Sequence, residues 1–430
     1  MKEDFLYYIW QQQYFDKTNL CTAEQEKIQV LKPGFLNANA GPDFMAAQLK
    51  IGQVTWNGSI EIHLKASDWL RHRHQEDTRY DQVILHVVWE NDQTLTRTDG
   101  SLIPVIQLKD RVDLNLLSTY HKLKNQPHLI PCAPFVPQVP TLPKLQMLDR
   151  VLLERLDEKT NVLTQQLQQV KYDWEEATYQ ALVANFGFKI NKEPFIRLSQ
   201  ILPFSVLRKH REEQTTLEAL LFGQAGFLQE VPETEPYLLK LAKEHAYLQH
   251  KYKLPEPLQA ADWNFLRLRP GNFPTVRLAQ LAAFLHGKSQ LFSALINLPG
   301  YKDYLHFFSV AVSAYWQKHY MPGRVWPREN KCMGKDSIDI LLINTVVPLL
   351  FTYARYSDSQ SLHDKALKLL EDIKAEKNNI TAIYTGLGFK NKSAQDSQAF
   401  LQLYHHYCTP RRCASCSIGH FILKSNCTTA

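Results

Sequence analysis

The sequence predicts an α+β protein in two parts: a small N-terminal α/β sandwich and a large all-helical domain. Before residue 125, apolar residues alternate or form short runs bounded by glycine, as in strands. After residue 143, they recur with the period of amphipathic helices. Between the two parts, proline recurs every three or four residues, at Pro127, Pro131, Pro134, Pro137, Pro140 and Pro143. Proline cannot continue a helix, so we expect an extended linker at 126–143 between domains at 1–125 and 144–430.

The N-terminal part is expected to contain a helix, three strands, a second helix and two more strands. The first helix covers residues 4–15 and begins at Asp4, a good capping residue. Asn57-Gly58 is a strong hairpin signal between two of the strands. The expected strands are 44–51, 53–56, 59–65, 83–89 and 102–108, with the second helix at 67–80.

The C-terminal part is expected to be helical almost throughout. No apolar run reaches the roughly 18 residues of a membrane span. Within 338–353, Asn344 and Pro348 predict a kinked, buried helix. The predicted helices are 144–170, 174–186, 194–210, 215–226, 235–252, 275–286, 289–296, 301–319, 336–355, 361–373 and 393–407.

The composition is that of an ordinary globular protein, with 430 residues, 44% hydrophobic and 21% charged. The N-terminus lacks the basic and apolar regions of a secretory signal. Seven cysteines, three of them between 408 and 416, do not resemble the disulfide framework of a secreted domain. We therefore expect a cytoplasmic protein without a membrane partner.

The charge is unevenly distributed along the chain. The first 140 residues carry 14 basic and 16 acidic side chains, and the remainder carries 35 and 27. A basic region attached to a neutral one is compatible with DNA or RNA as a partner, although it also fits an ordinary solvated surface.

The most informative motif is Gly41-Pro42-Asp43 followed by Glu61-Ile62-His63-Leu64-Lys65. Alternate residues of a strand share a face, so Glu61, His63 and Lys65 are expected to point the same way. If the strand after Asp43 pairs with this one, Asp43 approaches Glu61. Two adjoining carboxylates suit Mg²⁺ or Mn²⁺, which would activate a water that His63 and Lys65 orient. A simpler interpretation is a loop cap and a solvated strand face.

Within the predicted order of elements, Pro42-Asp43 and Glu61-x-His63 resemble the restriction-endonuclease-like superfamily, whose signature is PD-(D/E)xK. The resemblance covers about residues 1–115 and implies that Asp43 and Glu61 bind the metal. The lysine of that signature is replaced here by His63, and Lys65 lies two residues further on the same face. A histidine makes Mn²⁺ as plausible as Mg²⁺.

The whole chain also resembles an uncharacterised bacterial domain-of-unknown-function family. The segments that carry this resemblance are Gly41-Pro42-Asp43-Phe44, Trp56-x-Gly58-x-x-Glu61-x-His63, Ile84-Leu85-His86-Val87-Val88 and Arg269-Pro270-Gly271-Asn272-Phe273-Pro274. This resemblance implies no activity.

Four histidines lie close in sequence to Glu61. On the predicted helix 67–80, His74 would share a face with Asp77, and it is a candidate metal ligand or phosphate contact. His72 is expected in an exposed polar turn, and His86 is expected to be a hydrogen-bonded core residue.

The cysteines Cys408, Cys413 and Cys416 have a spacing that suits Zn²⁺ or an iron–sulfur cluster. Arg411 and Arg412 are expected to lower the pKa of these thiols. The fourth-ligand candidates are Cys427, His420, His406 and Cys332. Reduced thiols without a metal, and redox chemistry, are the alternatives.

Three functions follow from these patterns. The first is a metal-dependent nuclease-like protein that acts on nucleic acid phosphodiesters, with the helical domain as a clamp. The second is a non-catalytic nucleic-acid-binding or scaffold protein that keeps an eroded endonuclease-like domain. The third is a hydrolase of a smaller phosphorylated substrate.

Overall fold

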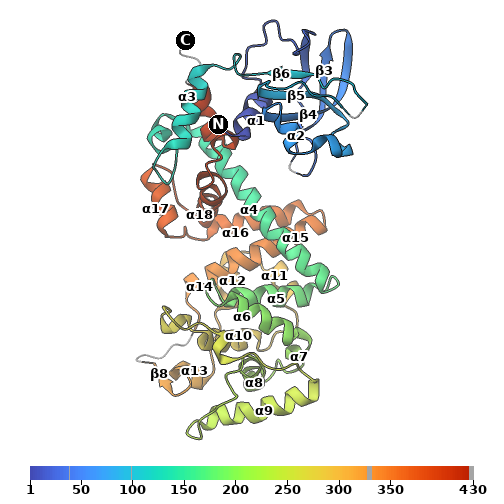
Figure 1. The fold of residues 1–430 in the computed structure, drawn as a ribbon. Coiled ribbons are helices and arrows are strands. Elements are labelled where there is room, and N and C mark those ends of the chain that lie inside the picture. Colours follow the sequence, from blue (N-terminus) through green and yellow to red (C-terminus); the bar gives the residue numbers. More distant parts are fainter. Residues whose placement is uncertain (38, 98, 327–331, 426–430) are drawn as a thin grey trace. The chain divides into compact units, whose positions relative to one another are not determined.

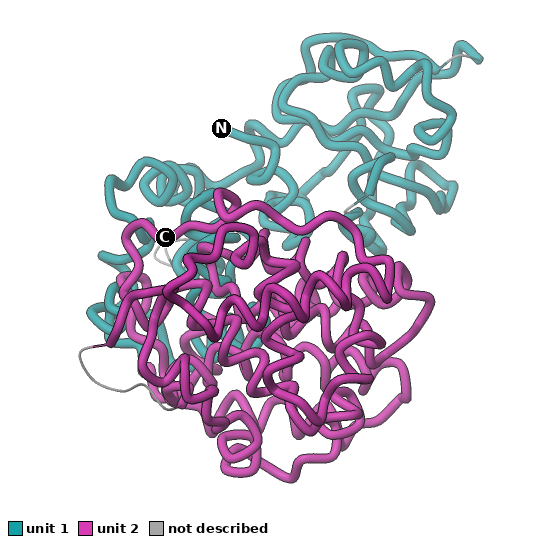
Figure 2. The backbone as a smooth tube through the Cα atoms, turned by 90° about the horizontal axis from the view of Figure 1, so that it is seen from below, with its two compact units in different colours: residues 1–151, 382–389, 400–430 teal, residues 152–381, 390–399 magenta. Residues whose placement is uncertain are grey.

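The computed structural model describes the whole chain except residues 38, 98, 327–331 and 426–430. It divides into two compact units (Figure 2): unit 1 contains residues 1–151, 382–389 and 400–430, and unit 2 contains 152–381 and 390–399. This division differs from the expected boundaries at 126–143, because the last helices belong to the same unit as the sheet.

Unit 1 is built on a mixed six-stranded sheet (Figure 1), which confirms the α+β class. The strand order is β1-β3-β4-β5-β6, with β2 also pairing with β3. The pairing of β3 with β4 is antiparallel, whereas β4, β5 and β6 run parallel. The strands are β1 (Ile28–Lys32), β2 (Phe35–Leu36), β3 (Phe44–Ile51), β4 (Val54–Lys65), β5 (Val83–Glu90) and β6 (Val105–Gln107).

The turn between β3 and β4 does not lie at Asn57-Gly58, so that hairpin prediction is wrong. Ile51 pairs with Val54, and Gly52 takes the left-handed conformation (φ +58°) in the two-residue turn between them. Gly58 lies inside β4, where a Cβ would meet the carbonyl oxygen of Gln82 at 2.5 Å. The glycine is therefore needed for a close approach to the segment that leads into β5.

Helix α1 (Glu3–Gln12) packs against β4 and buries an apolar face that includes Phe5, Ile9 and Trp10. The predicted helix 67–80 is wrong. Only α2 (Asp68–Arg71) is α-helical, and two 3₁₀ turns follow, η1 (His74–Glu76) and η2 (Thr78–Tyr80). The helix ends because Arg73 is left-handed, with φ 58°.

The proline-rich segment is not an extended linker. After α3 (Leu114–Asn125) it forms the 3₁₀ helix η3 (Ala133–Gln138), and its apolar side chains, among them Ile130 and Val136, are buried. Helix α4 (Thr141–Gln169) follows directly, beginning in unit 1 and ending in unit 2. The spacing of the prolines excludes an α-helix, but it does not prevent the segment from packing into the protein.

Three helical elements of unit 1 close the chain: the π-helical turn η7 (Tyr404–Cys408), the 3₁₀ turn η8 (Cys413–Ser415) and α19 (Ser417–Ser425). Helix α19 packs against α3 and η8, and it was not predicted. Before them, α17 (Asn379–Gly386) and α18 (Ala394–Leu403) each contribute residues to both units.

Unit 2 is helical, with one two-stranded ribbon. Pro203 divides the predicted helix 194–210 in two, and 301–319 is likewise two helices. The elements are α5 (Trp174–Phe186), α6 (Lys192–Ile201), α7 (Phe204–Lys209), α8 (Gln214–Gln224), α9 (Pro236–Tyr252), η4 (Ala260–Asp262), η5 (Pro270–Asn272), α10 (Pro274–Leu285), α11 (Leu291–Asn297), α12 (Tyr301–Phe308), α13 (Ala314–Lys318), β7 (His319–Met321), β8 (Arg324–Val325), α14 (Lys335–Leu341), η6 (Leu342–Val346), α15 (Val347–Tyr356) and α16 (Gln360–Asp372).

The run from Lys335 to Tyr356 is the one helix among the described residues that is long and apolar enough to cross a membrane. However, 78% of its most apolar window is buried inside the protein, as in a core helix. A π-helical turn, η6, lies at Asn344, just before Pro348. Since proline lacks an N–H, the turn accommodates the missing hydrogen bond where the sequence predicts a kink.

Candidate functional site

The pairing of β3 with β4 brings the two predicted carboxylates together. Phe44 lies opposite Ile60, so Asp43, immediately before β3, lies beside Glu61. The backbone N–H of Asp43 donates to Glu61 Oε2 at 3.1 Å, and that of Ile62 donates to Asp43 Oδ2 at 2.9 Å. Glu61 is only 4% exposed. The sheet therefore fixes both acids by backbone hydrogen bonds.

Helix α1 adds two polar side chains that the sequence analysis missed. Tyr7 Oη donates to Asp43 Oδ1 at 2.7 Å. Glu3 lies one turn earlier, and its negative charge acts on both Asp43 and Glu61. The available signal was a polar pair at positions i and i+4 beside the buried face of an amphipathic helix.

Burial raises the pKa of both Asp43 and Glu61 above the ordinary carboxylate range. The charge of Glu61 raises the pKa of Asp43 further, and the hydrogen bonds from Tyr7 and Ile62 oppose this effect only in part. Adjoining buried acids hold either a proton or a cation.

Two imidazoles lie against Oε1 of Glu61, and a third contacts one of them. His74 Nε2 lies 3.2 Å and His63 Nε2 lies 3.5 Å from Glu61 Oε1. His63 Nε2 is also 3.2 Å from His72 Nδ1, and the three histidines offer donor atoms within 4.8 Å of one another. Four donors arranged tetrahedrally around a metal at about 2.0–2.1 Å would be about 3.3 Å apart. The contacts of Glu61 with His74 and His63, and of His63 with His72, are each close to that value.

The reversal of the chain at Arg73 places His72 and His74 beside His63. With φ 58°, Arg73 is in a conformation that costs a non-glycine residue about 1 kcal/mol or more. The ring centroids of His72 and His74 lie 5.0 and 5.2 Å from that of His63. Tyr80 stacks on His74 at 3.8 Å and holds its ring.

His86 supports His63 from the next strand. The β4–β5 register pairs Glu61 with His86, whose Nε2 lies 2.9 Å from His63 Nδ1. Burial lowers the pKa of both histidines, so both are neutral near pH 7. If His63 donates its Nδ1 proton to His86, its Nε2 lone pair faces Glu61 and is available to a cation.

Lys65 lies outside this cluster. It is exposed at the end of β4, its backbone N–H donates to Asp68, and its charge acts on Asp92. Within the described residues, no contact joins Lys65 to Asp43 or Glu61. Arg71 is the exposed cation whose charge acts on His63 and Glu3.

Cys408, Cys413 and Cys416 are all buried in unit 1. Burial raises the pKa of Cys413 to about 12, and the nearby Arg411 lowers it by less. Arg411 therefore lowers the pKa of Cys413 as expected, but burial outweighs its effect. Cys332 is exposed in unit 2, and Cys427 lies outside the described residues.

The ring of His420, another candidate fourth ligand, packs against Tyr8 and Tyr14. His406 is exposed in η7.

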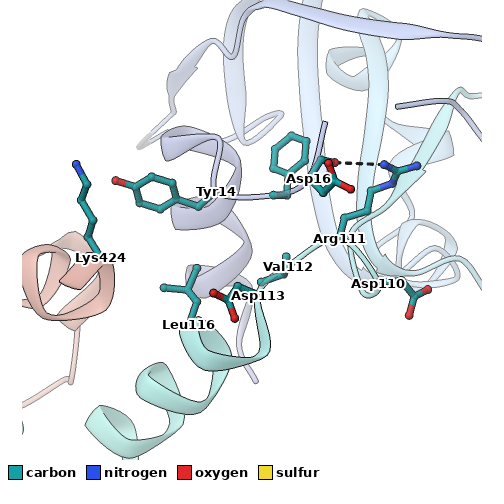
Figure 3. Close-up of a pocket in the computed structure, with 9 residues that line it drawn as sticks. Tyr14, Asp16, Asp110, Arg111, Val112, Asp113, Leu116 and Lys424 are labelled. Atoms are coloured by element: carbon teal, nitrogen blue, oxygen red, sulfur yellow. Dashed lines mark hydrogen bonds between the residues drawn. The ribbon is translucent and has the colours of Figure 1, made fainter. Parts of the chain in front are cut away.

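A pocket of about 460 Å³ in unit 1 contains none of the candidate residues (Figure 3). Arg111 crosses it and donates to the backbone oxygen of Asp16 at 3.2 Å. Its lining residues are Tyr14, Phe15, Asp16, Asp110, Arg111, Val112, Asp113, Leu116 and Lys424. Arg111 is already paired with backbone oxygens, so the pocket offers less chemistry than the cluster around Glu61.

The fold and the site together define an α+β protein with a buried cluster of acids and histidines on a mixed sheet. The chain belongs to the family described as protein of unknown function (DUF2851), whose model matches residues 3–379. This match confirms the predicted membership of a domain-of-unknown-function family. No curated protein and no solved structure matches the chain. The resemblance to the restriction-endonuclease-like superfamily therefore rests on the motif alone.

Proposed function

We propose that this protein is a metal-dependent phosphodiesterase of the nuclease type, with its metal site around Glu61. The observation that carries the proposal is the convergence of Asp43, Glu61, His63 and His74 from separate parts of unit 1. Backbone hydrogen bonds and burial hold these groups in place, as a preorganised metal site requires.

The donor set favours Mn²⁺ or Zn²⁺ over Mg²⁺. Mg²⁺ prefers octahedral oxygen ligands, whereas imidazole nitrogens suit the transition metals. His72 adds a third imidazole and is exposed, which leaves one side of the site open to solvent. An open side is what a hydrolytic metal needs for water and substrate.

A bound cation would polarise a phosphoryl oxygen and lower the pKa of a water molecule. The protein's own groups have separate tasks. Tyr7 fixes Asp43 by its hydrogen bond. Arg71, whose side chain is 69% exposed and lies 3.0 Å from Asp68, acts electrostatically on His63, and a guanidinium suits a phosphate group.

A non-catalytic nucleic-acid-binding protein is the second candidate, favoured by the position of Lys65. A catalytic lysine would have to reach the metal-bound water, and this one is exposed at the end of β4, where its charge acts on Asp92. A cluster that binds a metal without a nearby ammonium would suit a structural or recognition role.

The test is cleavage of labelled single- and double-stranded DNA and RNA by the full-length protein with Mg²⁺, Mn²⁺ or Zn²⁺. We expect cleavage with Mn²⁺ or Zn²⁺, its loss in Glu61→Gln, and no change in the exposed control Glu24→Gln. Cleavage that survives Glu61→Gln would exclude this site. Binding that weakens with salt, without cleavage, would support the second candidate. Hydrolysis of bis(p-nitrophenyl) phosphate alone would indicate a smaller substrate.

A further inference from the structure

Three buried cysteines of unit 1 occupy successive turns near the C-terminus. Cys408 ends η7, Cys413 begins η8 and Cys416 immediately precedes α19. The backbone N–H of Cys416 donates to the carbonyl of Cys413 at 3.2 Å. Helix α19 approaches closely, because a Cβ at Gly419 would lie 2.0 Å from that carbonyl oxygen. The turns therefore hold the three thiols in a compact arrangement.

A fourth buried cysteine comes from the proline-rich segment. Cys132 lies at the start of η3 and is within electrostatic range of the other three thiols. Contacts of residues before and after Cys132 hold the proline-rich segment against the C-terminal turns. Arg411 donates to the carbonyl of Lys124, and Arg150 donates to the carbonyl of Ser415 at 3.2 Å. Two segments far apart in sequence thus bring four buried thiols into the same part of unit 1, more widely spaced than the donor atoms of His63, His72 and His74.

The surroundings suit thiolates that carry a cation. All four cysteines are buried, so a bound cation would take the place of their thiol protons. Tyr384 Oη lies 3.2 Å from Cys408 Sγ, and the backbone N–H groups of Ile418 and Gly419 donate to the sulfur of Cys416. Such donors stabilise metal-bound thiolates.

Positive charge is also nearby. Lys124 and Arg411 act on Cys413, and Arg150 acts on Cys416. A metal held by four thiolates carries a net negative charge, which these side chains would offset.

We propose that Cys132, Cys408, Cys413 and Cys416 form a tetrathiolate metal centre that joins the proline-rich segment to the C-terminal helices. The centre takes an iron–sulfur cluster, whose irons the four cysteines share. A single zinc ion at about 2.3 Å from every sulfur would need the sulfurs closer together, within the 4.8 Å mutual distance that only the donor atoms of His63, His72 and His74 meet among the described residues. It is separate from the site around Glu61 and does not depend on the proposed phosphodiesterase activity. Its role is to tie the two segments of unit 1 together.

The experiment is metal analysis of the full-length protein, purified without oxygen, for zinc, iron and acid-labile sulfide. The double variant Glu61→Gln/His74→Gln removes ligands of the site around Glu61. Metal that this variant still contains can then be assigned to the cysteines. We expect one iron–sulfur cluster per chain in that variant, lost when Cys132→Ser is added and kept when Cys21→Ser is added. Iron together with sulfide identifies the cluster, whereas zinc without iron would overturn the proposal. Metal that remains after Cys132→Ser would overturn the proposal.

A measurement on the unmodified protein covers the case in which Cys132→Ser does not fold. Thiols are alkylated before and after treatment with a chelator and are located by mass spectrometry. We expect Cys332, which is exposed, to react in both conditions, and the four clustered cysteines to become reactive together only after the metal is removed. A protein that contains no metal and shows no change in cysteine reactivity on chelation would also overturn the proposal.

Discussion

Glu61 carries most of the chemistry that this chain offers. It is buried in a central strand, accepts a hydrogen bond from the backbone of Asp43, and faces the imidazoles of His63 and His74. An acid in such a place destabilises the metal-free fold, since its charge lacks the hydration it would have in the unfolded chain. Proteins keep such residues where function requires them.

Replacement of Glu61 by glutamine should stabilise the metal-free protein above pH 7. The pKa of Glu61 is raised from 4.5 in the folded state, so the folded state binds the proton more tightly than the unfolded chain. Its contribution to stability is complete below the unfolded pKa and is lost as the pH rises through the folded pKa. Glutamine does not titrate, so we expect a gain of about 1–2 kcal/mol at pH 8.5, and less at pH 6.5.

The measurement is urea unfolding with a chelator present at pH 6.5 and 8.5, with Glu24→Gln as the control. Burial also lowers the pKa of His63 and His86, which destabilises the fold as the pH falls below about 6.5 in both proteins. The comparison is therefore made above that value. A Glu61→Gln variant that is less stable than the wild type at pH 8.5 would contradict the pKa argument.

The hydrogen bond of Tyr7 offers a second test at the residue scale. Tyr7→Phe removes the donor to Asp43 Oδ1 but keeps the ring. We expect Mn²⁺ affinity to fall about fivefold, the equivalent of one hydrogen bond of about 1 kcal/mol. Calorimetric titration measures this, with the exposed Tyr247→Phe as the control. An unchanged Mn²⁺ affinity would show that Tyr7 does not position Asp43 for metal binding.

At the scale of elements, the turn between α2 and η1 builds half of the site. A continuous helix over 67–80 would have separated the rings of His72 and His74, whereas the left-handed Arg73 brings both towards His63. Helical spacing alone predicted a pairing of His74 with Asp77, but Asp77 instead bonds to Arg79. The conformation of one residue thus decides which groups His74 meets.

Substitutions at Arg73 should therefore affect metal binding according to their backbone preference. Glycine adopts positive φ without cost, whereas a β-branched residue does so only with strain. We expect Arg73→Gly to keep the Mn²⁺ affinity of the wild type and Arg73→Val to weaken it by roughly tenfold or more. Both variants lose the same charge, so equal affinities would show that the turn does not position the histidines.

The sequence was informative where local pattern and long-range pairing agree. The motif at Asp43 and Glu61 predicted two adjoining acids, because β3 and β4 are consecutive and pair directly. Glu3, Tyr7 and the contact between His63 and His86 were not predicted, since they depend on how α1 and β5 pack against β4. Gly58 was misread for a similar reason: its lack of a side chain serves packing and not a turn.

At the scale of the molecule, the N-terminal sheet depends on the C-terminal helices. His420 on α19 packs against Tyr8 of α1, and Arg411 donates to Lys124 at the end of α3. The proline-rich segment between these helices is itself buried. A division at residues 126–143 would therefore cut through unit 1.

A fragment of residues 1–143 should consequently fail to fold as an independent domain. We expect it to show rapid amide hydrogen exchange over the sheet, whereas the full-length protein protects β4 and β5, because the fragment exposes apolar surface that η8 and α19 cover. Native-like protection in the fragment would show that the sheet is an independent domain, as the sequence first suggested.

The central claim is that Glu61, His63 and His74 bind a transition metal, and anomalous scattering from crystals soaked with Mn²⁺ or Zn²⁺ tests it most directly. We predict one anomalous peak bounded by Glu61 Oε1, His63 Nε2 and His74 Nε2, at about 2.0–2.2 Å from each. The absence of a peak there in fully soaked crystals, or a peak that persists unchanged in Glu61→Gln, would contradict the claim.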